Sequence, residues 1–67
     1  MKIEVGSTVL CCFTMRRSKT YSRFGEPARD GDQGIVLRIN ELKDVSIVEF
    51  ETPRGKVHAH IQNLVDK

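Results

Sequence analysis

Residues 33–61 decide the fold, and they read QGIVLRIN (33–40), ELKD (41–44), VSIVEFE (45–51), TPRG (52–55) and KVHAHI (56–61). Branched and aromatic side chains recur in the three longer segments, which is typical of β-strands. The polar segments between them indicate turns. In TPRG the proline presets the backbone at the second turn position, and the glycine accepts the positive φ that closes the turn. The stretch therefore predicts three strands joined by tight turns.

The alternation of apolar and polar side chains predicts which face of each strand is buried. In 33–40, the residues Ile35, Leu37 and Ile39 share one face. In 56–61, Val57, Ala59 and Ile61 are expected to point inward, whereas Lys56, His58 and His60 are expected to face solvent. Together with the neighbouring segments, the predicted core consists of Val9, Ile35, Leu37, Ile39, Val48, Phe50, Val57, Ala59 and Leu64.

The flanking segments complete an all-β chain. The uncharged run TVLCCFTM (8–15) predicts a strand buried on both faces, and QNLV (62–65) is long enough for one tight helical turn and a short last strand. No segment keeps a helical period. Short strands in a chain of 67 residues favour closure of the sheet, which removes exposed edges. We therefore expect a single domain over residues 1–67, a small antiparallel barrel of four or five strands.

A long early loop interrupts this pattern at residues 16–32, RRSKTYSRFGEPARDGD. Charges, hydroxyls, glycine and proline break any period, so we expect the loop to be mobile. Loops of this length in compact domains are more often functional than plain connectors. Residues 16–29 contain five Lys or Arg and one acid, a charge of +4, while the rest of the chain carries −2. The loop is thus the electropositive part of the molecule.

The segment DGDQGIVLRI (30–39) contains a Gly-x-x-Gly-x-Val step formed by Gly31, Gly34 and Val36. With VGSTV (5–9) before it and VSIVEF (45–50) after it, the chain resembles SH3-like barrels of the KOW type from Val5 to Val65. The resemblance implies that the barrel is SH3-like. Gly31 suits a tight turn, and Gly34 suits a bend or bulge at the start of the strand. The chain departs from the KOW pattern at Asp32, where a basic residue is common.

The chain also resembles small SH3-like accessory subunits of electron-transfer complexes. Examples are the ferredoxin-docking subunit of photosystem I and the variable chain of ferredoxin-thioredoxin reductase. The shared signals are the Gly-x-Val step, the Val-x-Phe of the later strand and the late Leu-Val pair. This resemblance implies docking to a partner rather than chemistry, although a shared fold transfers shape better than function.

The loop combines the side chains that bind single-stranded nucleic acid, because cations contact phosphates and aromatic rings stack on bases. We predict a noncatalytic module that binds RNA or single strands, in transcription or translation, through Arg16, Arg17, Lys19, Tyr21, Arg23, Phe24 and Arg29. The alternative is an accessory subunit or inhibitor that uses this loop against an acidic protein surface. The two rings would instead belong to the core if the loop folded back. A secondary binding face consists of Arg54, Lys56, His58 and His60.

Other chemistry is not indicated. Cys11 and Cys12 are adjacent, which suits neither a disulfide nor a zinc site, and His58 and His60 lack further ligands at a recognisable spacing. No cysteine, histidine and orienting group form a nucleophilic site, so we expect no enzyme activity, cofactor or metal. The longest apolar run, residues 9–13, is far below the roughly 20 residues of a membrane span. We expect a cytoplasmic protein.

Overall fold

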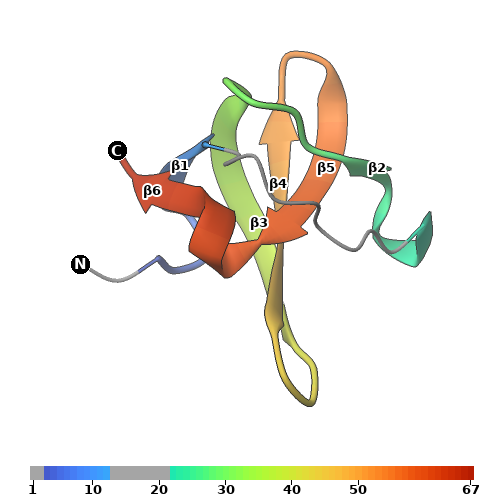
Figure 1. Ribbon diagram of the computed structural model, residues 1–67. Helices are drawn as coiled ribbons and strands as arrows, with labels where there is room; N and C mark the ends of the chain where they lie inside the picture. The colour runs from blue at the N-terminus through green and yellow to red at the C-terminus, as the bar shows by residue number, and fades with distance from the viewer. Residues whose placement is uncertain (1–2, 13–21) are drawn as a thin grey trace.

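The computed structural model describes residues 3–12 and 22–67 and contains one mixed sheet of six strands (Figure 1). The elements are β1 (Thr8–Cys11), the 3-10 turn η1 (Ser22–Phe24), β2 (Glu26–Pro27), β3 (Gln33–Glu41), β4 (Ser46–Thr52), β5 (Gly55–His60), the 3-10 turn η2 (Ile61–Asn63) and β6 (Leu64–Asp66). Neighbours in the sheet follow the order β2-β5-β4-β3-β1-β6. The all-β prediction is confirmed.

The three central strands match the predicted segments to within one residue at each end. The turn between β4 and β5 has the predicted chemistry. Thr52 Oγ1 accepts a hydrogen bond from the Arg54 backbone N–H and donates one to the Gly55 carbonyl oxygen, both at 3.0 Å. Gly55 has φ +114°, a conformation that other residues rarely adopt. The residues of the turn itself therefore determine how β4 connects to β5.

The predicted barrel of four or five antiparallel strands is only partly correct. The structure has six strands, β2 pairs parallel to β5, and β2 and β6 stand at the two edges of the described sheet, which is not closed. Pro27 has no N–H to donate, which is tolerated at an edge. Between β2 and β3, the Gly31 N–H donates a hydrogen bond to the Cys11 carbonyl oxygen at 2.9 Å. The segment after β2 thus continues the β1–β3 pairing.

Helical structure in residues 3–12 and 22–67 is confined to two 3-10 turns. The turn η2, directly before β6, confirms the helical turn and short last strand predicted near the C-terminus. The turn η1 and the strand β2 lie in the segment that was expected to be a patternless loop. Neither turn, nor any other helix of the described residues, has the length and apolar character that crossing a membrane requires.

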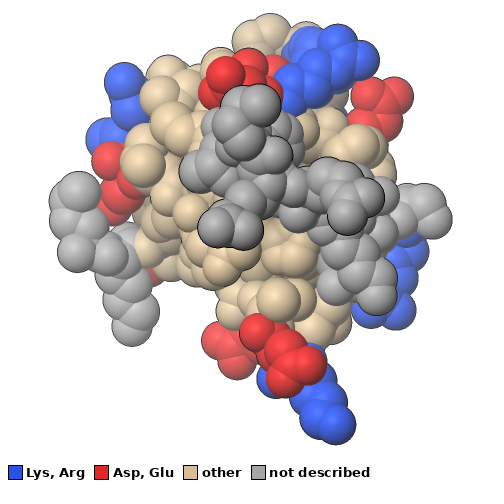
Figure 2. All heavy atoms as spheres, viewed as in Figure 1, with Lys and Arg blue, Asp and Glu red and all other residues tan. Residues whose placement is uncertain are grey.

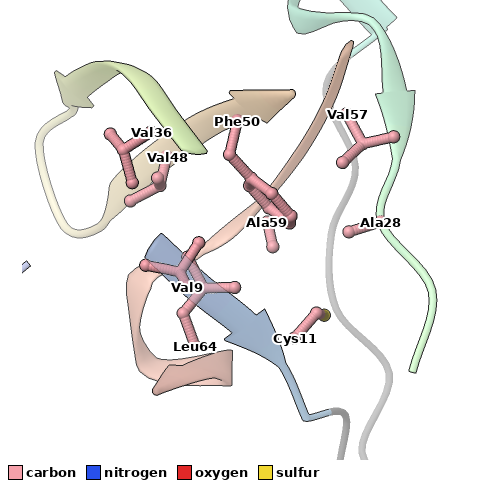
Figure 3. Packing of buried hydrophobic residues seen from close by; sticks show 9 residues of the cluster. All are labelled: Val9, Cys11, Ala28, Val36, Val48, Phe50, Val57, Ala59 and Leu64. Atoms are coloured by element: carbon pink, nitrogen blue, oxygen red, sulfur yellow. The ribbon is translucent and has the colours of Figure 1, made fainter. Parts of the chain in front are cut away.

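The core lies on the inner side of the curled sheet, where nine side chains converge (Figure 3). Phe50 lies at its centre. Six of the nine were predicted, and Ile39 packs against the cluster from a partly buried position. The nine residues are Val9, Cys11, Ala28, Val36, Val48, Phe50, Val57, Ala59 and Leu64.

The prediction was wrong for Ile35 and Leu37, whose side chains are 47% and 45% exposed, while Val36 between them is buried. A β-bulge explains the difference. Val36 pairs with Phe50 and Arg38 with Glu49, so Leu37 is an extra residue in β3. The bulge reverses the alternation and lets Val36 and Ile39 face the same side.

The bulge in β3 lies at Leu37 and not at Gly34, while the bend at Gly34 stays a prediction. A Cβ atom at Gly34 would lie 1.8 Å from the carbonyl oxygen of Glu51 in β4. The absence of a side chain is therefore what allows β3 and β4 to approach. Gly31 has φ +95° and occupies a turn, as predicted.

Candidate functional site

The basic segment, residues 16–29, is fixed to β5 by its C-terminal part. Phe24 is 8% exposed, and its ring meets that of His58 edge to face, with the ring centres 5.9 Å apart. Directly after it, Pro27 pairs with His58 in the parallel β2–β5 ladder, and the Ala28 N–H donates to the His58 carbonyl oxygen at 2.8 Å. The broken apolar pattern predicted a loop that is not packed on the sheet, and this was wrong for residues 24–28, whereas the mobility of the loop stays a prediction. Two apolar side chains and one short strand anchor residues 24–28.

The prediction that His58 and His60 face solvent was wrong, because both residues are buried. Both point away from the core face of β5, as the alternation indicated, but His58 is 2% exposed because the segment containing Phe24 covers that face. Burial lowers the pKa of His58. Hydrogen bonds to the backbone of Glu26 and Gly25, and the charge of Glu49, offset this only in part. The imidazole is therefore held neutral near pH 7, as a structural group under the basic segment.

Arg54, in the predicted secondary face, lies between two carboxylates. Its Nη2 is 2.5 Å from Asp32 Oδ2, and its Nη1 is 3.6 Å from Glu26 Oε1. Asp32 Oδ2 also accepts a hydrogen bond from the Arg29 backbone N–H at 2.9 Å. The hydrogen bond from Arg54 holds the pKa of Asp32 below its ordinary value, despite the opposing effect of burial. Asp32, which departs from the KOW pattern, thus neutralises a cation of the same surface.

Lys56 is paired in the same way. Its Nζ lies 3.2 Å from Oε1 of the buried Glu49, whose Oε2 accepts a hydrogen bond from Asn40 Nδ2 at 2.7 Å. Burial acts to raise the pKa of Glu49, but the contacts with Asn40 and Lys56 outweigh it, so this pKa lies below its ordinary value. The two cations of the predicted secondary face are therefore engaged in ion pairs, and its two histidines are buried.

Arg23 and Arg29 differ from these cations. Both are exposed, on either side of β2, and neither forms an ion pair with a carboxylate in the described ranges 3–12 and 22–67. The guanidinium carbon of Arg23 lies 4.9 Å from the centre of the Phe24 ring. Phe24 itself is buried and so is an anchor rather than the open stacking face that was predicted. The remaining predicted residues, Arg16, Arg17, Lys19 and Tyr21, lie outside the described residues.

The charges of the molecule are unevenly divided. The described residues include seven Lys or Arg and all nine acids, a formal charge of −2. On the face in Figure 2, blue and red side chains lie next to each other at the top and at the hairpin tip at the bottom, and the coloured residues form no continuous blue surface. The described part of the molecule is therefore mildly acidic, its charged residues are mixed in sign, and the basic segment is attached to it.

The cysteines and potential metal ligands are dispersed. Cys11 belongs to the core, where burial raises the pKa of its thiol to about 12, while Cys12 is exposed. This opposite placement agrees with the expectation for neighbouring residues of a strand. No three His, Cys, Asp or Glu side chains of the described part gather where they could share a metal ion.

The burial of Phe24 agrees with the alternative in which the loop folds back, but sequence reasoning missed its partner His58 and the buried group of Glu49, Asn40 and Lys56. An available signal was Phe24 itself, because an aromatic residue among charges can serve as an anchor.

Comparison with models of known families, with curated proteins and with solved structures gave no match. The resemblance to SH3-like barrels of the KOW type, and to the SH3-like accessory subunits, therefore stays a prediction.

Proposed function

We propose that this chain is a noncatalytic binding module, an SH3-like barrel that holds RNA or another single-stranded nucleic acid along residues 16–29. The observation that carries the proposal is the position of Arg23. Its guanidinium lies over the buried Phe24 ring, 4.9 Å from the centre, while the residue itself is exposed. The side chain is thus supported on one side and accessible from solvent.

A guanidinium that rests on an aromatic ring suits the binding of a single strand better than a guanidinium without such support. Its charge attracts phosphate, and its plane offers a surface on which an unpaired base can stack. Contact with an aromatic ring orders the long side chain beforehand, so less conformational entropy is lost on binding. Arg23 thereby takes the stacking role that the sequence suggested for Phe24.

The distribution of ion pairs also favours the basic segment. Arg54 and Lys56 already contact Asp32, Glu26 and Glu49, so much of their charge is balanced. The cations without such a partner in the described part include Arg23 and Arg29. With Arg16, Arg17 and Lys19 in the same stretch of sequence, a polyanion would meet its strongest attraction there.

The course of the chain supports the SH3-like part of the proposal. The first strand, β1, lies between β3 and the last strand, β6, so the first and last strands pair with each other in a curled sheet (Figure 1). The noncatalytic part is supported by the roles of Asp32, Glu49 and His58. Each of these groups is engaged in contacts that hold the fold together.

The test is binding of fluorescently labelled 20-nucleotide single strands of RNA and DNA, and of the corresponding duplexes, measured by anisotropy. We expect single strands to bind more tightly than duplexes. Arg23→Ala should weaken binding by about 10-fold, the effect of one stacking contact. The affinity of Arg23→Lys, which keeps the positive charge and loses the planar guanidinium, should lie between those of the wild type and Arg23→Ala. Lys43→Ala, at the exposed tip of the β3–β4 hairpin, is the control and should bind as the wild type does.

Two results would overturn the proposal. One is the absence of any binding to single strands at low salt. The other is an Arg23→Ala variant that binds them as tightly as the wild type. If labelled polyglutamate bound with the same dependence on Arg23 and nucleic acid did not, the basic segment would serve the alternative function, docking to an acidic protein surface.

A further inference from the structure

A second surface of the molecule is apolar and lies on the outer side of β1, β3 and β6. Val9 and Cys11 of β1 point into the core, so Leu10 between them points outward. Val65 of β6 is paired with Leu10, and Ile35 of β3 is paired with Thr8, which places both on the same outer side. Val65 is 45% exposed, comparable to Ile35 and Leu37. We call Leu10, Ile35, Leu37 and Val65 the outer apolar face.

The bulge in β3 produces this face. A regular strand would have turned Ile35 and Leu37 toward the core, as the sequence alone predicted. With Val36 buried instead, the two large residues Ile35 and Leu37 are exposed on the outer side of β3. Clusters of large exposed apolar residues on a small protein are typical of interaction surfaces. The folding of the single chain therefore does not explain why Ile35 and Leu37 are exposed.

The dimensions of the molecule suit an interface on one of its faces. The chain is nearly isometric, 23 × 22 × 21 Å, with an accessible surface of 4674 Å². A standard interface covers about 800 Å² of each partner, which is roughly one sixth of this surface. A small domain with a limited core also gains stability by covering such a face.

The charges beside the apolar face indicate which partner fits. Glu51 of β4 is paired across the sheet with Ile35, at one end of the exposed stretch of β3, and Arg38 follows Leu37 at the other end. Both are exposed. Within the sheet Glu51 lies opposite Lys56 and Arg38 opposite Glu49, but neither Glu51 nor Arg38 forms an ion pair within the described residues. The surface thus carries a carboxylate at one end and a guanidinium at the other. A two-fold axis exchanges these ends, so the surface is complementary to itself.

We propose that the outer apolar face binds a second copy of this chain, with a two-fold axis near Leu37. In this dimer Ile35 and Leu37 of the two copies pack together, and Glu51 of each copy faces Arg38 of the other. Arg23 comes directly before β2, at the opposite edge of the sheet from β6, and the proposed contact through β3 does not involve it.

The test begins with the mass of the wild-type protein in solution, measured by light scattering and sedimentation from 5 to 500 µM. We expect a concentration-dependent dimer. Leu37→Asp should shift the equilibrium to the monomer, while Leu42→Asp, in the turn at the far end of β3, should leave it unchanged. Circular dichroism and thermal unfolding of each variant show whether it is folded.

Charge reversal provides a test that does not depend on an apolar substitution. Arg38→Glu alone and Glu51→Arg alone each place like charges opposite each other, so each should be monomeric. Mixed in equal amounts, the two variants restore both opposite-charge contacts and should form a heterodimer. The double variant should form a homodimer.

A wild-type protein that is monomeric at 500 µM would overturn the proposal. So would a dimer that Leu37→Asp does not weaken while the variant remains folded. If Leu37→Asp did not fold, the outcome would rest on the mixed charge variants, and their failure to associate would overturn it as well.

Discussion

The ring of His58 supports the ring of Phe24 edge to face, with 5.9 Å between their centres, and Phe24 in turn lies under the guanidinium of Arg23. A buried group of the sheet is thereby connected to an exposed cation through one aromatic side chain. Changes at His58 or Phe24 should therefore affect both the stability of the fold and the position of Arg23. Changes at Arg23 should affect binding, with only a small effect on the stability of the fold.

Phe24→Ala should lower the free energy of unfolding by about 3 kcal/mol, because the substitution removes a buried ring and leaves a cavity beside His58. The matched control is Arg23→Ala, which removes an exposed side chain and should cost at most about 1 kcal/mol. Urea denaturation followed by circular dichroism measures both. A loss below about 0.5 kcal/mol in Phe24→Ala would show that the segment is not anchored by this ring.

Stability should fall as the pH drops from 7 toward 5. Burial lowers the pKa of His58 in the folded protein, so below about pH 6.5 the unfolded chain takes up a proton that the folded chain resists. The lowered pKa values of Asp32 and Glu49 add losses only at more acidic pH, starting in the range where carboxyls ordinarily take up protons and continuing below it. Urea denaturation at pH 7.5, 6.5 and 5.5 measures the effect.

The variant His58→Gln separates this contribution, because glutamine keeps a hydrogen-bond donor and has no titration in that range. Its stability should depend less on pH between 7.5 and 5.5 than that of the wild type. His60→Gln is the matched control and should keep the contribution of His58. An unchanged pH dependence in His58→Gln would assign the acid sensitivity to other groups.

Gly34→Ala should destabilise the protein by about 3 kcal/mol or more, because the added methyl group would lie 1.8 Å from the Glu51 carbonyl oxygen and must push β3 and β4 apart. Gly31→Ala is the comparison. Its Cβ meets nothing within 4 Å, so only the cost of φ +95° remains, about 1–2 kcal/mol. Equal losses in the two variants, measured by thermal unfolding, would contradict the role of close strand approach at Gly34.

Much of the fold could be predicted because its signals are local. The turn from Thr52 to Gly55 and the three strands of the meander depend on neighbouring residues only. The buried face of β3 could not be predicted in the same way. Val36 and Leu37 are equally apolar, so the position of the extra residue is decided by the register with β4.

The candidate site was harder to predict because it depends on contacts between distant segments. Alternation placed His58 correctly on the side of β5 opposite Val57, but the cover over that side comes from η1 and Phe24, earlier in the chain. Glu26 and Pro27 have no preference for strands, and they form β2 beside β5 between the buried side chains of Phe24 and Ala28.

The salt dependence of single-strand binding tests the central claim most directly, measured with a labelled oligouridylate from 25 to 300 mM salt. Three or more phosphate contacts predict a slope of about −2 or steeper in a plot of log K against log salt concentration, at about −0.7 per contact. Arg23→Ala should make the slope shallower by about 0.7 as well as weakening binding. A slope near zero, or the wild-type slope and affinity in Arg23→Ala, would contradict a nucleic-acid interface built on Arg23 and its support by Phe24.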